Sequence, residues 1–233
     1  MRQPPRLDGQ SILAVFAHPD DESLSAGGTL ARLADEGARV TVVCATHGEC
    51  GSGLVEGGPS LARRRALELR AAVESLALHE LILLNHPDGD LRWTDMTQFT
   101  AELAHVIARQ TPAAIITFDQ DGLYWHPDHI GVHERVLSAV HTFGDAAPPV
   151  YGVTLRAEPI TEAVDAARAR GWQAPSGGFW NLPPDVFGRH ALPSPLVIDV
   201  SDWVPRKVAA ICAHETQMGP IHPFSELSPE DAR

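Results

Sequence analysis

The sequence contains no long apolar run. None of its 233 residues fall in a stretch that approaches the roughly 20 apolar residues a membrane-spanning helix requires. The short apolar run 12–17, which follows Arg2 and Arg6, barely reaches the lower limit for a signal peptide, and cleavage there would remove the first predicted strand. We therefore expect a soluble cytoplasmic protein with no membrane partner.

Cysteine is scarce. The chain has three cysteines, Cys44, Cys50 and Cys212, an odd number with no Cys-x-x-Cys spacing. This pattern argues against a disulfide framework and against a structural zinc ribbon. Reduced thiols in the cytoplasm fit the pattern better.

Basic residues are also few. The 18 lysines and arginines face 30 acidic residues, which gives a formal net charge of -12. Phosphate backbones and anionic membranes would be repelled over most of such a surface. We expect a small-molecule partner and no nucleic acid, and leave a homo-oligomer open.

Short continuous β-branched runs alternate with helical spacing along the chain. Strands are predicted at 12–17, 39–45, 81–84, 113–118 and 150–155, and helices at 30–36, 61–78, 99–109 and 130–143. Continuous apolar strands are typical of parallel sheets covered on both faces. The pattern predicts an α/β fold, a Rossmann-like, doubly wound and mostly parallel sheet.

The last third of the chain has a looser pattern. Clusters of proline and glycine surround a predicted strand at 196–200, and a predicted helix at 205–216 follows it. No repeat or low-complexity linker separates this part from the rest. We expect one domain over 1–233, with its core at 8–155 and a C-terminal elaboration at 156–233.

Two polar clusters directly follow predicted strands. His18-Pro19-Asp20-Asp21-Glu22 comes after the first strand, and Tyr124-Trp125-His126-Pro127-Asp128-His129 comes after the fourth. Open α/β sheets bind ligands at the carboxyl ends of their strands. In the common strand order 3-2-1-4-5, strands one and four are neighbours, so the two clusters are expected to face each other.

The clusters supply the ligand types of a catalytic zinc. Such an ion takes three N or O ligands from the protein and keeps one position open. Two histidines and one carboxylate satisfy this requirement. Either cluster alone is typical of a solvated turn or an acidic helix start, but two clusters after two core strands favour a metal site.

The motifs resemble those of the PIG-L or LmbE-type deacetylases, which act on N-acetylglucosaminyl conjugates. The resemblance is carried by the segments 17–22, 27–29, 46–49 and 124–129 and by Arg65-x-x-Glu68-Leu69. It extends to the predicted C-terminal helix, where His214 and Gln217 resemble the ending of the family. The two His-Pro-Asp motifs in this order are specific.

The resemblance implies the metal ligands and the base. His18, Asp21 and His129 correspond to the ligands of one Zn²⁺ per chain, and other divalent metals such as Fe²⁺ are left open. Asp20 corresponds to the general base, which takes a proton from the attacking water.

The resemblance also implies further site residues. His126 corresponds to an imidazolium that stabilises the oxyanion, Asp128 to its orienting partner, and Tyr124 to a further oxyanion or leaving-group contact. The implied substrate-binding residues are Arg65, Asp88 and Glu49.

Two other histidines lie near these motifs. His133 follows His129 by four residues on the same predicted helix face, but a lone helix histidine is usually surface or core filler. His86 begins a third His-Pro-Asp sequence after the third strand, and we expect it to be a rim residue at the edge of the sheet.

Two rival functions remain to be weighed. A nucleotide-binding Rossmann-type protein needs Gly-x-Gly-x-x-Gly after the first strand, where this chain has carboxylates that would repel a pyrophosphate. A non-catalytic metal- or carbohydrate-binding module would have no need of Asp20 beside the metal. The sequence therefore favours a metal-dependent amidohydrolase.

The substrate is the least specified part of the prediction. Members of this family act on N-acetylglucosaminyl malate in thiol biosynthesis, on inositol conjugates, on chitooligosaccharides or on antibiotic precursors. The acidic surface and the lack of a membrane anchor disfavour a glycolipid. We favour an N-acetylglucosamine-containing small molecule, with N-acetylglucosaminyl malate as one candidate.

Overall fold

The computed structural model describes residues 6–51, 57–93, 95–155, 157–171, 173, 182–183, 186–187 and 196–218. Its strands are β1 (Ser11–Phe16), β2 (Arg39–Thr46), β3 (Glu80–His86), β4 (Ala114–Phe118) and β5 (Val150–Val153). They form one five-stranded sheet in the order β3-β2-β1-β4-β5, and every pairing is parallel. The predicted α/β class and strand order are confirmed, with β3 at an edge.

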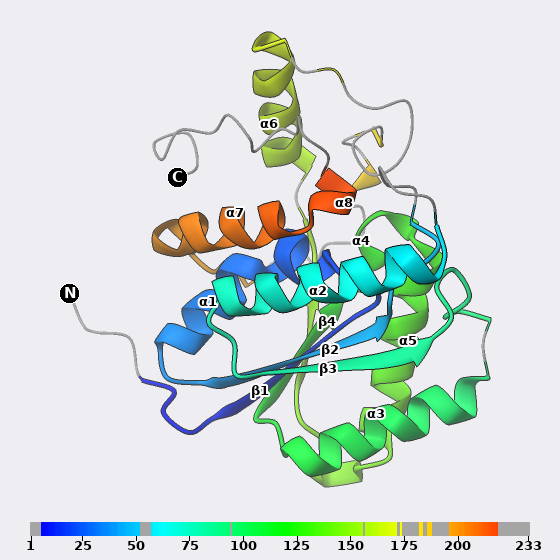
Figure 1. The fold of residues 1–233 in the computed structure, drawn as a ribbon. Coiled ribbons are helices and arrows are strands. Elements are labelled where there is room, and N and C mark those ends of the chain that lie inside the picture. The colour runs from blue at the N-terminus through cyan, green and yellow to red at the C-terminus, as the bar shows by residue number, and fades with distance from the viewer. Residues whose placement is uncertain are drawn as a thin grey trace.

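Helices cover both faces of the sheet. One face carries α1 (Gly27–Asp35), α2 (Pro59–Ser75) and α7 (Val204–Ala213), and the other carries α3 (Met96–Gln110) and α5 (Pro127–His141) (Figure 1). Short elements complete the described chain: η1 (Glu22–Ala26), α4 (Gly122–Trp125), η2 (Gly144–Ala146), η5 (Ser201–Trp203) and α8 (Glu215–Met218). None of the described helices combines the length and apolarity that crossing a membrane would take.

The central strand explains the continuous apolar pattern. In β1, every residue from Ile12 to Phe16 is buried, because helices lie above and below it and strands lie on both sides. Alternation of apolar and polar residues is expected only where one face meets water. The parallel pairing of β1 with β4 places the carboxyl ends of both strands side by side, where the two polar clusters begin.

The strand predicted at 196–200 is wrong. These residues are described and form no strand. Their backbone crosses the outer face of α1, where Arg32 donates to the carbonyl of Asp199 at 2.8 Å and Val200 lies against Gly28. Leu196 and Val197 are more than 70% exposed, so the apolar residues of this run are not buried as those of a sheet strand would be.

Two helical features differ from the prediction. The helix α6 (Ala157–Ala169) was not predicted, although its alanine-rich sequence has helical spacing. The helix predicted at 205–216 is real but divided, because α7 ends and α8 begins on either side of His214, whose ψ of 56° is not helical.

Candidate active site

The loop after β1 turns the side chains of the first cluster toward one point. The carboxylate of Asp21 accepts a hydrogen bond from the backbone N–H of His18 at 2.8 Å, and the Asp21 N–H donates to the His18 carbonyl at 3.3 Å. Asp20, between them, has a φ of 125°, a strained value for a residue with a Cβ. The loop therefore presents His18 and Asp21 together and Asp20 on its own.

The loop after β4 is also strained. Leu123 and Trp125 both have a φ of 68°, and Gly122 has a φ of 56°. A Cβ on Gly122 would lie 2.9 Å from the Cβ of His129, so only glycine fits there. Strain of this kind collects at functional sites, and here it places α5 so that His129 faces β1.

Three side chains from these loops form a buried group. His18 Nδ1 lies 3.3 Å from Asp21 Oδ2 and 3.3 Å from His129 Nε2, and His129 Nε2 lies 3.2 Å from Asp21 Oδ1. An ion with tetrahedral bonds of about 2.0–2.1 Å separates its ligand atoms by about 3.3 Å. The spacing and chemistry of the predicted ligands thus fit a tetrahedral divalent metal.

Neighbouring groups orient both imidazoles. The Nδ1 atom of His129 lies 3.1 Å from the carbonyl of Gly122, and this carbonyl can accept only from a protonated Nδ1, so Nε2 is left to bind an ion. His18 Nε2 lies 3.1 Å from Asp88 Oδ1 and 3.1 Å from Asp128 Oδ2, so its Nδ1 is the free atom. Such outer partners are a regular part of metal sites.

A second possible ligand group shares His18. It combines His18 with His126 and Asp128. His18 would have to use Nε2 there, the atom that is held as a donor between the carboxylates of Asp88 and Asp128. The group of His18, Asp21 and His129 is therefore the better metal site.

Charge within the group also suits a cation. Burial lowers the pKa of His18, but its contacts with Asp128, Asp21 and Asp88 outweigh burial and hold that pKa well above its usual value. Burial would raise the pKa of Asp21, but His129 and His18 hold it well below its usual value. Without a metal, a protonated His18 thus lies among the carboxylates of Asp21, Asp88 and Asp128, and a metal ion would replace that proton.

Asp20 stands beside the metal group without joining it. Burial raises its pKa to about 6, against the opposing influence of the Arg65 guanidinium. The carboxylate is therefore mostly ionised at neutral pH, and a bound dication would lower its pKa further. A pKa just below the working pH suits a general base.

His126 differs from its predicted protonation state. Burial, followed by the charges of His129 and His18, lowers the pKa of His126 to about 4, and a bound cation would act in the same direction. Its Nδ1 accepts the backbone N–H of Asp128 at 3.2 Å, so the proton of the neutral ring is on Nε2. In the metal-free protein His126 is thus a neutral Nε2–H donor at pH 7, not the predicted imidazolium.

Asp128 hydrogen-bonds to His126 through its backbone N–H and not through its carboxylate. The carboxylate instead accepts the backbone N–H groups of Gly89 at 2.8 Å and Leu91 at 3.0 Å, in addition to its contact with His18. Asp128 therefore holds the loop after β3 against the metal group.

Further residues on the same face of α5 contact the loop after β3. Gly131 and Arg135 follow Asp128 at helical spacing, and a Cβ on Gly131 would lie 2.8 Å from the backbone nitrogen of Arg92. Arg135 is fully buried and donates to the carbonyl of Arg92 at 3.2 Å. Their spacing, three residues from Asp128 to Gly131 and four more to Arg135, could have indicated these residues, which our sequence reasoning missed.

The predicted substrate-binding residues Asp88 and Glu49 are linked to each other. Asp88 Oδ2 accepts the backbone N–H of Cys50 at 2.7 Å, and the N–H of Asp88 donates to Glu49 Oε1 at 3.0 Å. Glu49 Oε2 is buried and has no hydrogen-bond partner among the described residues. Glu49 therefore keeps an acceptor for a hydroxyl group beside the site.

Tyr124 lies within the same cluster of rings. Its ring centroid is 5.7 Å from that of His126 and 5.3 Å from that of His129, both in edge-to-face contact. Burial raises the pKa of Tyr124 well above its usual value, so it keeps its proton. Its position is compatible with the predicted contact to an oxyanion or leaving group.

Arg65 is buried under the first loop, not exposed to the space above it. It is 3% exposed and donates to the carbonyl of Gly48 at 2.9 Å and to that of Pro19 at 2.5 Å. Its guanidinium also lies 3.3 Å from the carboxylate of Asp20. These contacts indicate that Arg65 sets the position of Asp20, whereas the sequence predicted a substrate contact.

We predict that Arg65→Lys lowers kcat more than it raises KM. One ammonium cannot reproduce the planar fork that serves two carbonyls and a carboxylate, and an unsatisfied buried acceptor costs about 1–3 kcal/mol. Steady-state kinetics and thermal melting test this. Arg64→Lys on the exposed face of the same helix is the control, and an effect of Arg65→Lys on KM alone would restore the predicted substrate contact.

Neither His133 nor His86 joins the metal group. The Nδ1 atom of His133 lies 2.9 Å from the carbonyl of Phe118 in β4. His86 is buried, not a rim residue as predicted, because its ring packs on Phe99 at 4.2 Å and its Nε2 lies 2.9 Å from Glu102. His133 therefore links α5 to β4, and His86 links β3 to α3.

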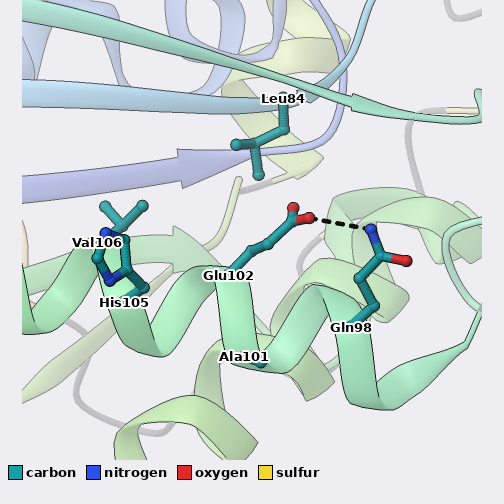
Figure 2. A pocket seen from close by; sticks show the side chains of 6 residues that line it. All are labelled: Leu84, Gln98, Ala101, Glu102, His105 and Val106. Carbon is teal, nitrogen blue, oxygen red and sulfur yellow. Dashed lines mark hydrogen bonds between the residues drawn. The ribbon is translucent and has the colours of Figure 1, made fainter.

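A hollow lined by α3 and Leu84 lies away from the metal group. Figure 2 shows Glu102 bonded to Gln98 at its rim, with Leu84 of β3 opposite. Its volume is about 390 Å³ and its wall is almost entirely hydrocarbon. It offers none of the clustered ligands found at the ends of β1 and β4, which remain the candidate active site.

Known proteins resemble this chain over most of its length. A 1D-myo-inositol 2-acetamido-2-deoxy-alpha-D-glucopyranoside deacetylase of Acidothermus cellulolyticus is 32% identical over 94% of this chain and 83% of its own length. The protein of the same name from Nakamurella multipartita is 34% identical over 89% of this chain and 79% of its own length.

The fold has a counterpart among solved structures. The N,N'-diacetylchitobiose deacetylase of Pyrococcus horikoshii superposes with a TM-score of 0.65 at 25% identity, over 94% of this chain and 74% of that one. The model of the GlcNAc-PI de-N-acetylase family (PIG-L) matches residues 13–140, the part that contains both polar clusters and the metal group they form. By this match, and by relatives that share about a third of its residues, the chain belongs to the GlcNAc-PI de-N-acetylase (PIG-L) family.

Proposed function

We propose that this protein is a zinc-dependent deacetylase that hydrolyses the N-acetyl group of an N-acetylglucosamine-containing small molecule. The products are acetate and the free amine. The observation that carries the proposal is the buried group of His18, Asp21 and His129 with Asp20 beside it but outside it. A non-catalytic metal-binding module has no use for that extra carboxylate.

The side chains around the metal group divide the work of amide hydrolysis. When bound, zinc would supply Lewis acidity, which polarises an amide carbonyl and lowers the pKa of water. Asp20 is ionised at neutral pH and takes the proton from the attacking water. His126, with its proton on Nε2, donates to the oxyanion of the tetrahedral intermediate. Asp20 then returns its proton to the leaving amine.

Zinc is the metal we propose, at one ion per chain. Two imidazole nitrogens and a carboxylate suit zinc better than magnesium or calcium, which prefer all-oxygen sites. Ferrous iron also accepts this ligand set, so metal analysis of the purified protein decides between them.

An inositol conjugate is the substrate class we favour. Two relatives that are about a third identical bear the name of a deacetylase for 2-acetamido-2-deoxyglucopyranosyl inositol. Glu49 Oε2, for which the described residues offer no hydrogen-bond partner, suits a sugar hydroxyl. Glu49 also borders a groove of about 580 Å³ between the loops after β2 and β3, which has room for the group attached to the sugar.

The cellular setting is also a proposal. None of the described cysteines forms a disulfide, in agreement with a reducing compartment, and we place the protein in the cytoplasm. We also propose that 156–233 elaborates the single domain whose core is 8–155, because α7 packs on α1 and α2.

Acetate release tests the proposal. We expect the zinc-loaded protein to release acetate from N-acetylglucosaminyl inositol faster than from N-acetylglucosaminyl malate or diacetylchitobiose. The protein treated with a chelator is the control, and zinc should restore its rate. Stoichiometric zinc binding with no acetate from any of these compounds would instead support a binding module.

A further inference from the structure

We propose that His214, near the C-terminal end of the described chain, is a positioning residue for the general base Asp20 and acts through Glu22. This inference rests on the proposed function, because Asp20 is the base of that reaction. It assigns a task to the helices α7 and α8, which lie beside the site without supplying a metal ligand.

Glu22 connects the two residues directly. Its Oε2 accepts the backbone N–H of Asp20 at 3.1 Å, and its Oε1 lies 2.8 Å from His214 Nε2. Ser23 donates to the same Oε1 at 2.5 Å. Glu22 and His214 are 1% and 0% exposed, so water cannot replace these contacts.

The backbone of Asp20 needs such support. Its φ of 125° is unfavourable for a residue with a side chain, and strain of this kind persists only when surrounding contacts impose it. The Asp20 carbonyl accepts from Ser23 and Leu24, and within the described part of the chain Glu22 is the one acceptor for the Asp20 N–H. Release of that N–H would let the strained Asp20 backbone relax and shift its carboxylate, which Arg65 contacts at its far end, relative to the metal group.

His214 is the charged partner of Glu22, beside the neutral hydroxyl of Ser23. Burial opposes protonation of the imidazole, but the Glu22 carboxylate raises the pKa of His214 above its usual value. A buried charge-assisted hydrogen bond is strong and directional. The His214 ring is placed by the break between α7 and α8, and α8 is anchored where Thr216 donates to Glu68 at 2.6 Å.

Two substitutions of His214 separate positioning from folding. His214→Phe keeps the size of the ring and removes the donor, whereas His214→Gln keeps a donor near the position of Nε2. We expect His214→Phe to lower kcat by about 10- to 100-fold, because small misplacement of a catalytic group costs this much. KM and zinc content should stay within about two-fold, and His214→Gln should recover most of kcat.

Thr216→Val is the matched control. It removes the hydroxyl bond to Glu68, but the backbone N–H of Thr216 still donates to Glu68 Oε1 at 3.0 Å and keeps the segment anchored, so the contact between His214 and Glu22 stays in place. We expect it to lower the melting temperature and to keep the wild-type kcat.

The proposal is overturned if His214→Phe keeps kcat within two-fold of wild type. It is also overturned if Thr216→Val lowers kcat as much as His214→Phe does while the two variants have the same melting temperature. If the wild type releases no acetate, the proposed function fails first. A crystal structure of His214→Phe still tests the positioning then, because the N–H of Asp20 should have left Glu22, and an unchanged Asp20 backbone would refute the inference.

Discussion

Asp20→Asn is expected to lower the rate of deacetylation by about 10²- to 10⁴-fold, the usual contribution of a general base. The amide has the shape of the carboxylate but cannot take a proton from water. Zinc content should be unchanged, because Asp20 lies outside the group of His18, Asp21 and His129. Zinc analysis and acetate release on the same preparation measure both quantities.

The pH profile gives a second readout for Asp20. With a pKa of about 6 or below when a cation is bound, the wild-type rate should fall as the pH drops through that value, because the base becomes protonated. The residual rate of Asp20→Asn should lack this acidic limb if Asp20 is its source.

Asp21→Asn is the natural contrast. It removes an anionic ligand, so zinc affinity should fall first and excess zinc should restore part of the activity. If Asp20→Asn loses zinc and Asp21→Asn retains it, the two roles are exchanged.

The double variant His18→Ala, His129→Ala is expected to lose zinc altogether during purification. Two of three protein ligands are removed, and the affinity should fall by several orders of magnitude because a single carboxylate holds the ion poorly. Metal analysis after mild purification and competition with a chromophoric chelator measure the loss. Activity should fall with the metal content.

His133→Ala is the matched control for this variant. His133 lies one helical turn after His129 on α5, but its Nδ1 contacts the Phe118 carbonyl. It should keep one zinc per chain. Full zinc occupancy in the double variant would refute the ligand assignment, and loss of zinc from His133→Ala would make that residue a ligand.

The strands of the sheet could be predicted because their signals are local, and their order was taken from the common order of doubly wound folds. Continuous apolar runs such as 12–17 and 39–45 are typical of strands in a parallel sheet that is covered on both faces. The run 196–200 misled us because the same composition also serves an extended segment packed on a helix. A run of this composition becomes a sheet strand only if a neighbouring strand is available to pair with it. That depends on how the whole chain folds, not on the run itself.

The site could be predicted where it consists of short motifs. His18 and Asp21 lie in one loop, and His129 begins the next helix at the adjacent strand, so topology alone brings them together. Arg65 and His126 were assigned roles by resemblance, and the structure revises their environment. The buried position of Arg65 and the lowered pKa of His126 depend on atoms from several distant segments.

The separation of the ligands along the chain has a consequence for assembly. His18 and His129 are 111 residues apart, yet their ring nitrogens are 3.3 Å apart in the folded protein. During synthesis the tetrahedral set cannot exist until α5 has left the ribosome and β4 has joined β1, so loading follows folding of the first half of the domain. Once bound, the ion cross-links two distant segments and adds stability by mass action, about 4 kcal/mol at a free concentration a thousand times its Kd. Zinc starvation should therefore shorten the lifetime of the protein as well as abolish its activity.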